Sequence, residues 1–171
     1  GGPLNVTFPN ITSPLERDFV AAAETLQYRE NKDFNGDEQD GFGQHQVTQK
    51  NGRRWSTAMA YLRPALSRKN LTVMTDAPVS RIVLEGRRAV GVVVGGTGGS
   101  GGERRILARR EVILSLGAVI SPKLLMLSGI GDGGELKAHG IATVHHLPGV
   151  GKNLQDHAAI GVMMRTLSRE P

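Results

Sequence analysis

The chain has 171 residues, of which 39% are hydrophobic, 22% charged and 4% aromatic. This length suffices for one domain with a core or for parts of two, and the few aromatic residues predict a core of Val, Leu, Ile and Ala. The absence of cysteine excludes disulfides, thiolate catalysis and cysteine metal sites. No apolar run approaches the roughly 18 residues that a membrane helix requires.

The formal charge of +5 and the pI near 10.0 raise the question of a nucleic-acid partner. The basic residues fall in short pairs beside turns and expected strand ends, and no stacking aromatic residues accompany them. Proteins that bind RNA or single strands usually need such aromatic platforms, so we expect no nucleic-acid partner. The pairs are Arg53-Arg54, Arg87-Arg88, Arg104-Arg105 and Arg109-Arg110.

The first predicted helix covers residues 14 to 28. Ser13 and Glu16 have the spacing of a capping box, and Pro14 occupies the first helical position. Apolar residues follow at helical spacing and form one apolar face. They are Leu15, Phe19, Ala22, Ala23 and Leu26.

Residues 31 to 44 are rich in Asp, Asn and Gly and predict a loop, with its clearest turn at residues 33 to 36. Residues 44 to 50 follow as a short strand. A second helix begins after Ser56, which we expect to cap it. This helix is disturbed at Pro64, because proline cannot donate a helical hydrogen bond.

Three strands follow at residues 71 to 75, 79 to 85 and 89 to 94, and a tight turn at residues 85 to 88 joins the last two. Residues 95 to 102 contain six glycines in eight positions, which predicts a flexible linker between adjacent strands. A natural hairpin tip and an engineered splice both explain this composition. Neither gives the linker a function.

The elements expected in the C-terminal half alternate between strands and helices. They are a buried strand at residues 112 to 116, helices at 121 to 128 and 134 to 139, a strand at 141 to 145, a turn at 147 to 151 and the start of a strand within 159 to 166. This order, with buried apolar strands, predicts an α/β or mixed α+β fold around a sheet.

The junction at Gly117 and Ala118 is the most informative part of the sequence. Small residues directly after a buried strand let a ligand or a helix approach the backbone closely. A helix that opens at Ser121 points backbone N–H groups outward at the carboxyl edge of the sheet, where nucleotide phosphates commonly bind. Close packing of a helix against the sheet explains the same residues, and the spacing alone leaves both interpretations open.

The segment from Gly117 to Gly131, GAVISPKLLMLSGIG, resembles a signature of the glucose-methanol-choline (GMC) family of flavin oxidoreductases. The segment from Gly149 to His157, GVGKNLQDH, resembles a second motif of that family. The resemblance covers residues 2 to about 162. Leu116 departs from it, because a small residue usually precedes this glycine in the family. Shorter matches in the family's order are residues 33 to 36, 52 to 56 and 60 to 62.

The resemblance implies FAD as the cofactor and a small-molecule alcohol as the substrate. It implies part of an FAD-binding Rossmann-like domain at residues 51 to 155, with pieces of a substrate domain at residues 1 to 50 and 156 to 171. Six residues are implied as cofactor contacts, the first of them touching the adenine through its backbone N–H and C=O. They are Val79, Gly117, Ala118, Ser121, Asn153 and Asp156.

Two further elements of the family have no counterpart in this sequence. No G-x-G-x-x-G follows an N-terminal strand to hold the flavin pyrophosphate, and no segment carries the family's C-terminal catalytic histidine pair. The N-terminus has neither an initiator Met nor a signal-peptide pattern. We therefore expect the central portion of a longer enzyme, without a catalytic residue. It needs the remaining portions to oxidise a primary alcohol to an aldehyde.

Histidine residues offer weaker candidates for chemistry. His157 follows Asp156, but adjacent residues on a strand point to opposite faces, so we expect a structural role, or a place in the flavin-proximal crossover between domains, rather than a catalytic pair. His145 and His146 have no further ligand at useful spacing, which predicts no metal site. Two rival functions stay open: the cyanohydrin (hydroxynitrile) lyase branch of the same family, and a non-enzymatic basic α/β module that binds an acidic partner or nucleic acid.

Overall fold

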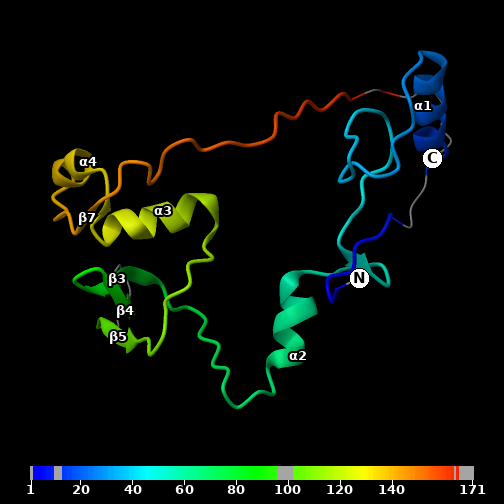
Figure 1. Ribbon diagram of the computed structural model, residues 1–171. Helices are drawn as coiled ribbons and strands as arrows, with labels where there is room; N and C mark the ends of the chain where they lie inside the picture. Colours follow the sequence, from blue (N-terminus) through cyan, green and yellow to red (C-terminus); the bar gives the residue numbers. More distant parts are fainter. Residues whose placement is uncertain (1, 10–12, 96–101, 164, 166–171) are drawn as a thin grey trace. The chain divides into compact units, whose positions relative to one another are not determined.

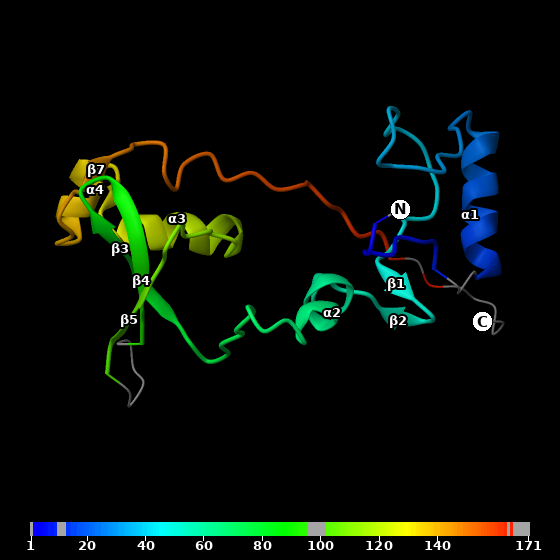
Figure 2. The same cartoon turned by 60° about the horizontal axis from the view of Figure 1, so that its bottom comes forward.

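The computed structural model describes residues 2–9, 13–95, 102–163 and 165, and its contacts divide the chain into two compact units. The first unit takes in residues 1–73 together with 164–171, and the second spans Met74–Met163. Figures 1 and 2 label most of the helices and strands of each. The mixed α/β character expected from the sequence is confirmed. The domain boundaries expected at residues 50 and 155 concern the whole protein and stay predictions.

Helix α1, Pro14–Thr25, is the main helix of the first unit (Figure 1). The Ser13 hydroxyl accepts the N–H of Leu15 at 3.3 Å, and proline occupies the first helical position. The predicted helix start is therefore confirmed. The helix ends three residues before its predicted end, because Gln27 adopts a φ of 66°, outside the helical region.

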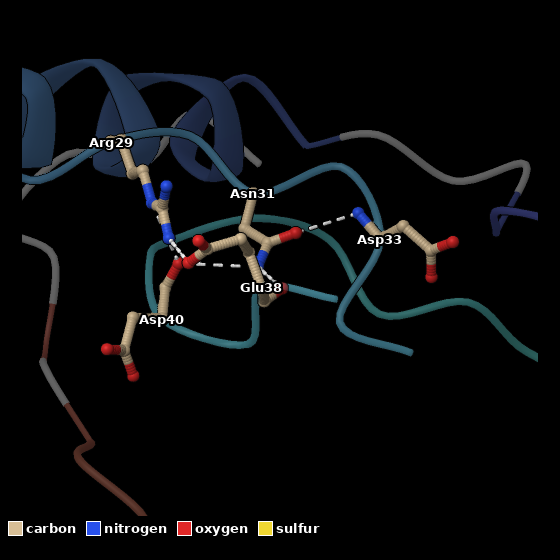
Figure 3. Close-up of polar contacts among 5 residues, drawn as sticks. All are labelled: Arg29, Asn31, Asp33, Glu38 and Asp40. Carbon is tan, nitrogen blue, oxygen red and sulfur yellow. Dashed lines mark hydrogen bonds and ion pairs between the residues drawn. The ribbon is translucent and has the colours of Figure 1, made fainter. Parts of the chain in front are cut away.

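The predicted acidic loop is organised around Asn31, whose side chain is buried (Figure 3). Its amide group donates to the backbone carbonyls of Glu38 at 2.8 Å and Asp40 at 3.3 Å, and its Oδ1 accepts the N–H of Asp33 at 2.8 Å. Arg29 forms an ion pair with the carboxylate of Glu38. The loop thus folds onto one buried side chain, while its acidic side chains stay exposed.

A short hairpin follows, made of β1, Gln49–Lys50, and β2, Arg53–Arg54 (Figure 2). Asn51 and Gly52 turn the chain with φ values of 51° and 70°, which suit a tight two-residue hairpin turn. The strand predicted over residues 44 to 50 is reduced to its last two residues, and β2 was not predicted.

The second predicted helix is present as two consecutive helical turns, η1, Ala58–Leu62, and α2, Arg63–Ala65. Ser56 directly precedes Thr57, which already has helical backbone angles, and the C=O of Ser56 accepts the N–H of Ala60 at 2.9 Å. The expected position of Ser56 before the helix is therefore confirmed, but its hydroxyl makes no capping hydrogen bond among the described residues. Hydrogen bonding changes from π-type to α-type just before Pro64, which lies in the first turn of α2. Pro64 has no N–H to donate within this continuous run of helical turns, which is the disturbance expected from the sequence.

The sheet of the second unit has three antiparallel strands in the order β3-β4-β5 (Figure 2). They are β3, Val79–Glu85, β4, Arg88–Val94, and β5, Arg104–Leu107. The predicted hairpin between the first two is confirmed. The glycine-rich segment joins adjacent strands, as expected, and its residues 96–101 lie outside the described residues.

Val79 lies at the open edge of this sheet. Gly95 donates its N–H to the C=O of Pro78 at 2.9 Å, immediately outside the pair formed by Val79 and Val94. In an antiparallel sheet this pattern marks a non-hydrogen-bonded pair, so the N–H and C=O of Val79 point away from β4. The register shifts just after Val79, and the N–H of Ile82 faces the same edge.

Helix α3, Gly117–Leu127, packs against β3 (Figures 1 and 2). It begins four residues before the predicted start at Ser121, so that start is wrong. The reason lies in the local hydrogen bonding: the Oγ of Ser121 accepts the N–H of Leu116 at 3.2 Å. Ser121 therefore satisfies a backbone donor at the helix start from inside the first turns, instead of preceding the helix.

The buried strand predicted at residues 112 to 116 is wrong. These residues belong to no strand, and Ile113 and Leu116 are 76% and 44% exposed. A strand that is buried on both faces needs neighbouring elements, and no described strand pairs with this segment. The strands predicted at residues 71 to 75 and 159 to 166 are also wrong over their described residues, where the backbone forms no ladder.

A two-stranded parallel sheet and a short helix complete the second unit. The strands are β6, Ile130–Gly131, and β7, His145–His146. Helix α4, Gly133–Ala138, lies between them in sequence and confirms the prediction to within one residue. Asp132 caps α4 by accepting two backbone N–H groups at 2.9 and 3.0 Å. The strand predicted at residues 141 to 145 overlaps β7 only at its last residue, and β6 was not predicted.

The buried apolar side chains among the described residues are all Ala, Ile, Leu or Val, which confirms the predicted core composition. Leu136 of α4 and Val93 of β4 are fully buried. Because most of this core belongs to the second unit, α3, the three-stranded sheet and α4 are held together by apolar packing. The core residues are Ala23, Ala60, Ile82, Val93, Leu124, Leu136 and Val150.

Candidate functional site

A groove of about 1170 Å³ runs between α3 and residues 149–155 in the second unit. Three of the six predicted cofactor contacts line it: Ala118, Ser121 and Asn153. The two sequence motifs, which are separated by the α4 region, therefore meet at one surface. This volume is slightly above the range of roughly 300–1,000 Å³ that is typical of cavities that bind small molecules or cofactors.

The α3 wall of the groove is largely apolar and includes Pro122, Leu125 and Met126. Pro122 lies inside the helix, where it cannot donate the usual hydrogen bond to the C=O of Ala118. The facing wall turns sharply at Gly151, whose φ is 79°. Such a groove offers apolar contact area with a few backbone polar groups at its rim.

Gly117 begins α3 but does not line the groove. Its φ of 85° lies in the left-handed region, which glycine adopts without steric cost. A Cβ at this position would meet no heavy atom within 4 Å. Backbone conformation is thus the reason for glycine here, and no described part of the chain makes the close approach that the sequence led us to expect.

Asn153 and Asp156 follow the groove's second wall and differ in their placement. Asn153 lines the groove and has a φ of 54°, a left-handed conformation that asparagine tolerates better than most residues. Asp156 is exposed and outside the groove lining, and its Oδ1 accepts the N–H of His157 at 2.8 Å. The structure therefore does not bring Asp156 together with the other predicted contacts.

Val79 is not part of the groove lining either. It occupies the edge of β3, the strand on which α3 packs. Its backbone N–H and C=O face the open side of the sheet, as a backbone contact to a ligand requires. The candidate site is therefore a groove with three of the predicted residues, plus an adjoining strand edge with a fourth.

The charged side chains that line the groove are cationic. Lys123 and Lys152 both contribute, and no Asp or Glu does. Lys152 pairs with Glu135 of α4, and the hydrogen bond to that carboxylate raises the pKa of Lys152. Lys123 takes part in none of the ion pairs found among the described residues. The groove therefore favours a ligand with a negative charge next to an apolar or planar part.

Asp132 and His146 form a polar cluster beside α4 that the sequence analysis missed. The N–H of Glu135 above all, together with that of Gly134, lowers the pKa of the Asp132 carboxyl. The Nδ1 of His146 accepts the N–H of Gly133 at 3.0 Å. Asp132 is followed three residues later by a glutamate, and this spacing is a sequence signal for a helix start. The capping role of Asp132 could therefore have been predicted from the sequence. No sequence signal indicated the hydrogen bond between His146 and Gly133.

A second cavity, of about 530 Å³, lies along α1 in the first unit. None of the predicted cofactor contacts lines it. Within the described parts of the chain, no three His, Cys, Asp or Glu side chains are grouped so that they could hold a metal ion. No helix among the described residues is long and apolar enough to cross a membrane.

The family model of the GMC oxidoreductases matches residues 1–159. An "Alcohol dehydrogenase [acceptor]" of Pseudomonas putida is 47% identical over 99% of this chain and 31% of its own length. The mitochondrial choline dehydrogenase of Homo sapiens is 50% identical over 93% of this chain and 26% of its own length. The chain thus spans about a third or less of these relatives.

Solved structures agree with the sequence match. Pyridoxine 4-oxidase from "Mesorbium loti" has a TM-score of 0.76 at 34% identity and matches 86% of this chain and 29% of its own. An FAD-dependent oxidoreductase from Chaetomium thermophilum has a TM-score of 0.84 at 30% identity and matches 91% of this chain and 27% of its own. Sequence, fold and the two motifs that meet at the groove lead to one conclusion: the chain belongs to the GMC oxidoreductase family.

Proposed function

We propose that this chain is a portion of an FAD-dependent alcohol oxidoreductase and contributes the adenosine side of the flavin site. The observation that carries the proposal is the meeting of Ala118, Ser121 and Asn153 around one groove. The names of the relatives, an alcohol dehydrogenase and choline dehydrogenases, support an alcohol as the substrate of the whole protein.

The residues present fit a dinucleotide in three respects. The groove offers apolar walls for a flat base, and its cationic lining suits phosphate. The backbone N–H and C=O of Val79 face the open edge of β3, where an adenine edge would find one donor and one acceptor. Gly117 leaves its surroundings open, so a ligand atom can lie against the backbone there.

Each predicted contact receives a role on this proposal. Val79 binds the adenine edge through its backbone, and Gly117 and Ala118 form the floor next to it. Ser121 and Asn153 face the phosphate side from opposite walls of the groove. Asp156, which lies outside the groove, is assigned to the flavin site of the whole protein rather than to the adenosine part.

Bound flavin supplies the chemistry, because it can accept a hydride from the alcohol carbon. The residues of this chain bind and orient the adenosine half and keep the phosphate charge next to lysine. Removal of the alcohol proton needs a base, and we assign that base to no residue of this chain. The remaining portions of the enzyme are therefore partners in catalysis. On this proposal the substrate is a primary alcohol and the product is an aldehyde.

Calorimetric titration with the two halves of the cofactor tests the proposal. We expect the purified chain to bind AMP, which carries the adenosine phosphate half, in a one-to-one complex. FMN, which carries the flavin half, should neither bind at similar concentration nor displace AMP. Equal binding of both nucleotides, or of neither, would contradict the assignment of the adenosine half to this chain.

A turnover measurement tests the second part of the proposal. The chain is mixed with FAD and a primary alcohol such as choline, and flavin absorbance is followed without oxygen. We expect no bleaching, because the base is missing from this chain. Alcohol-dependent bleaching would show that the chain holds the base after all.

A further inference from the structure

Ser128 joins helix α3 to the open edge of β3. Its Oγ accepts the backbone N–H of Ile82 at 2.8 Å and donates to the C=O of Leu124 at 2.6 Å. Ser128 is 8% exposed and lies directly after the last residue of α3. We propose that Ser128 is a positioning residue, which sets the placement of the α3 groove against the β3 edge and so orients a bound nucleotide.

The hydroxyl group is the chemical feature that this position needs. A strand edge exposes N–H groups that require acceptors, and the end of a helix exposes C=O groups that require donors. A hydroxyl provides both functions with one atom. Because the contact is buried, removal of the hydroxyl leaves an N–H of β3 without a partner, and such groups are costly in proteins.

The position of Ile82 explains how this contact reaches the candidate site. Val79 and Ile82 both turn their backbone N–H groups to the same edge of β3. At the other end of α3, Ala118 and Ser121 line the groove. The inference rests on the proposed function, since it assumes that a nucleotide spans the β3 edge and the groove. The two hydrogen bonds of Ser128, which join β3 to α3, then fix the β3 edge and the groove relative to each other.

Gly129, the next residue, ties the end of α3 to a second segment of the chain, the one before β7. Its C=O accepts the N–H groups of Val144 at 2.8 Å and His145 at 3.1 Å. Its φ is 82°, and a Cβ would lie 2.6 Å from the C=O oxygen of Ala142. The end of α3 is therefore tied on one side to β3 through Ser128 and on the other to the segment before β7. This turn can act as a fixed anchor for the helix.

Three variants of the full chain test the role of Ser128. Ser128→Ala removes both hydrogen bonds, and Ser128→Thr retains a hydroxyl. Ser80→Ala is the matched control, because the Ser80 hydroxyl donates within the sheet, to the C=O of Val93 at 3.4 Å, and does not reach α3. Each variant is compared by amide hydrogen exchange of Ile82 and by AMP affinity, well below the unfolding transition.

We expect Ser128→Ala to speed exchange at Ile82 about tenfold or more and to weaken AMP binding by a similar factor. Ser128→Thr should restore much of both, and Ser80→Ala should change neither. A purely structural role would speed exchange throughout the second unit and leave the AMP affinity of the folded chain unchanged. That result, or unchanged exchange at Ile82, overturns the inference.

The design separates this inference from the proposed function. If the unmodified chain binds no AMP, the adenosine site is wrong and the positioning role falls with it, whatever the exchange data show. If the unmodified chain binds AMP and Ser128→Ala binds it equally well, only the role of Ser128 is wrong.

Discussion

Arg81 and Glu103 are joined by two hydrogen bonds of 2.9 Å, from the two terminal guanidinium nitrogens to the two carboxylate oxygens. Arg81 belongs to β3, and Glu103 directly precedes β5, so the pair spans the strand between them. Both side chains are partly exposed, which limits the stability that the pair supplies. Its geometry nevertheless links the two outer strands of the sheet.

Acid should weaken this link. The hydrogen bond from Arg81 above all lowers the pKa of Glu103 from its ordinary value of 4.5. A carboxyl with a lower pKa in the folded chain stabilises the fold above its unfolded pKa, and the contribution is lost as the pH falls through the folded value. We therefore expect the thermal midpoint of the second unit to fall below about pH 4.5.

Circular dichroism melts between about pH 6 and about pH 3 check this prediction. The fall in midpoint should be smaller in Glu103→Gln, which keeps an oxygen acceptor but carries no titrating charge. Glu111→Gln, outside the sheet, serves as the control and should retain the full pH dependence. Identical pH dependence in Glu103→Gln and the unmodified chain would show that the pair contributes nothing.

Gly91 should be among the positions least tolerant of substitution. It lies in β4, and a Cβ there would be 2.3 Å from the carbonyl oxygen of Ile106 in β5. Because the obstacle is backbone of a paired strand, relief requires the strands to separate. We expect Gly91→Ala to lower the free energy of unfolding by about 2–3 kcal/mol.

Urea unfolding of matched alanine variants provides the measurement. A Cβ at Gly102 meets no heavy atom within 4 Å, so Gly102→Ala should change the stability by less than about 0.5 kcal/mol. Similar losses for the two variants would mean that the clash at Gly91 is not the cause.

Local signals predicted much of this fold. The hairpin between β3 and β4 was predictable because alternating apolar residues flank a tight glycine turn, and α1 because Ser13 and Pro14 mark its start. The strand expected at residues 112 to 116 failed for a non-local reason. Its continuous apolar pattern indicates burial on both faces, and burial depends on neighbours that the described residues do not supply.

The candidate site was predictable to a similar extent. The two motifs pointed to Ala118, Ser121 and Asn153, which the fold brings together. The sequence placed the start of α3 at Ser121, because a serine followed by proline usually precedes a helix. It held no sign that Ser128 meets Ile82, since that contact joins residues 46 positions apart.

Gly117 allows a test of why glycine stands at the start of α3. Its φ is 85° and its surroundings are open, so backbone conformation alone should set the cost of substitution. We expect Gly117→Ala to lower the free energy of unfolding by about 1–2 kcal/mol. Gly117→Asn should cost less, because asparagine adopts left-handed φ values more readily. Thermal unfolding checks both, and equal costs for alanine and asparagine would contradict the explanation.

Lys123 should decide how strongly the groove attracts a phosphate. It lines the groove and joins none of the ion pairs of the described residues, whereas Lys152 is paired with Glu135. We expect Lys123→Glu to weaken AMP binding about threefold to tenfold in low salt, and less in high salt, where exposed charges are screened. Lys137→Glu makes the same charge change on α4, outside the groove lining. Calorimetric titration that finds equal losses for both variants would mean that net charge alone, and not this groove, attracts the nucleotide.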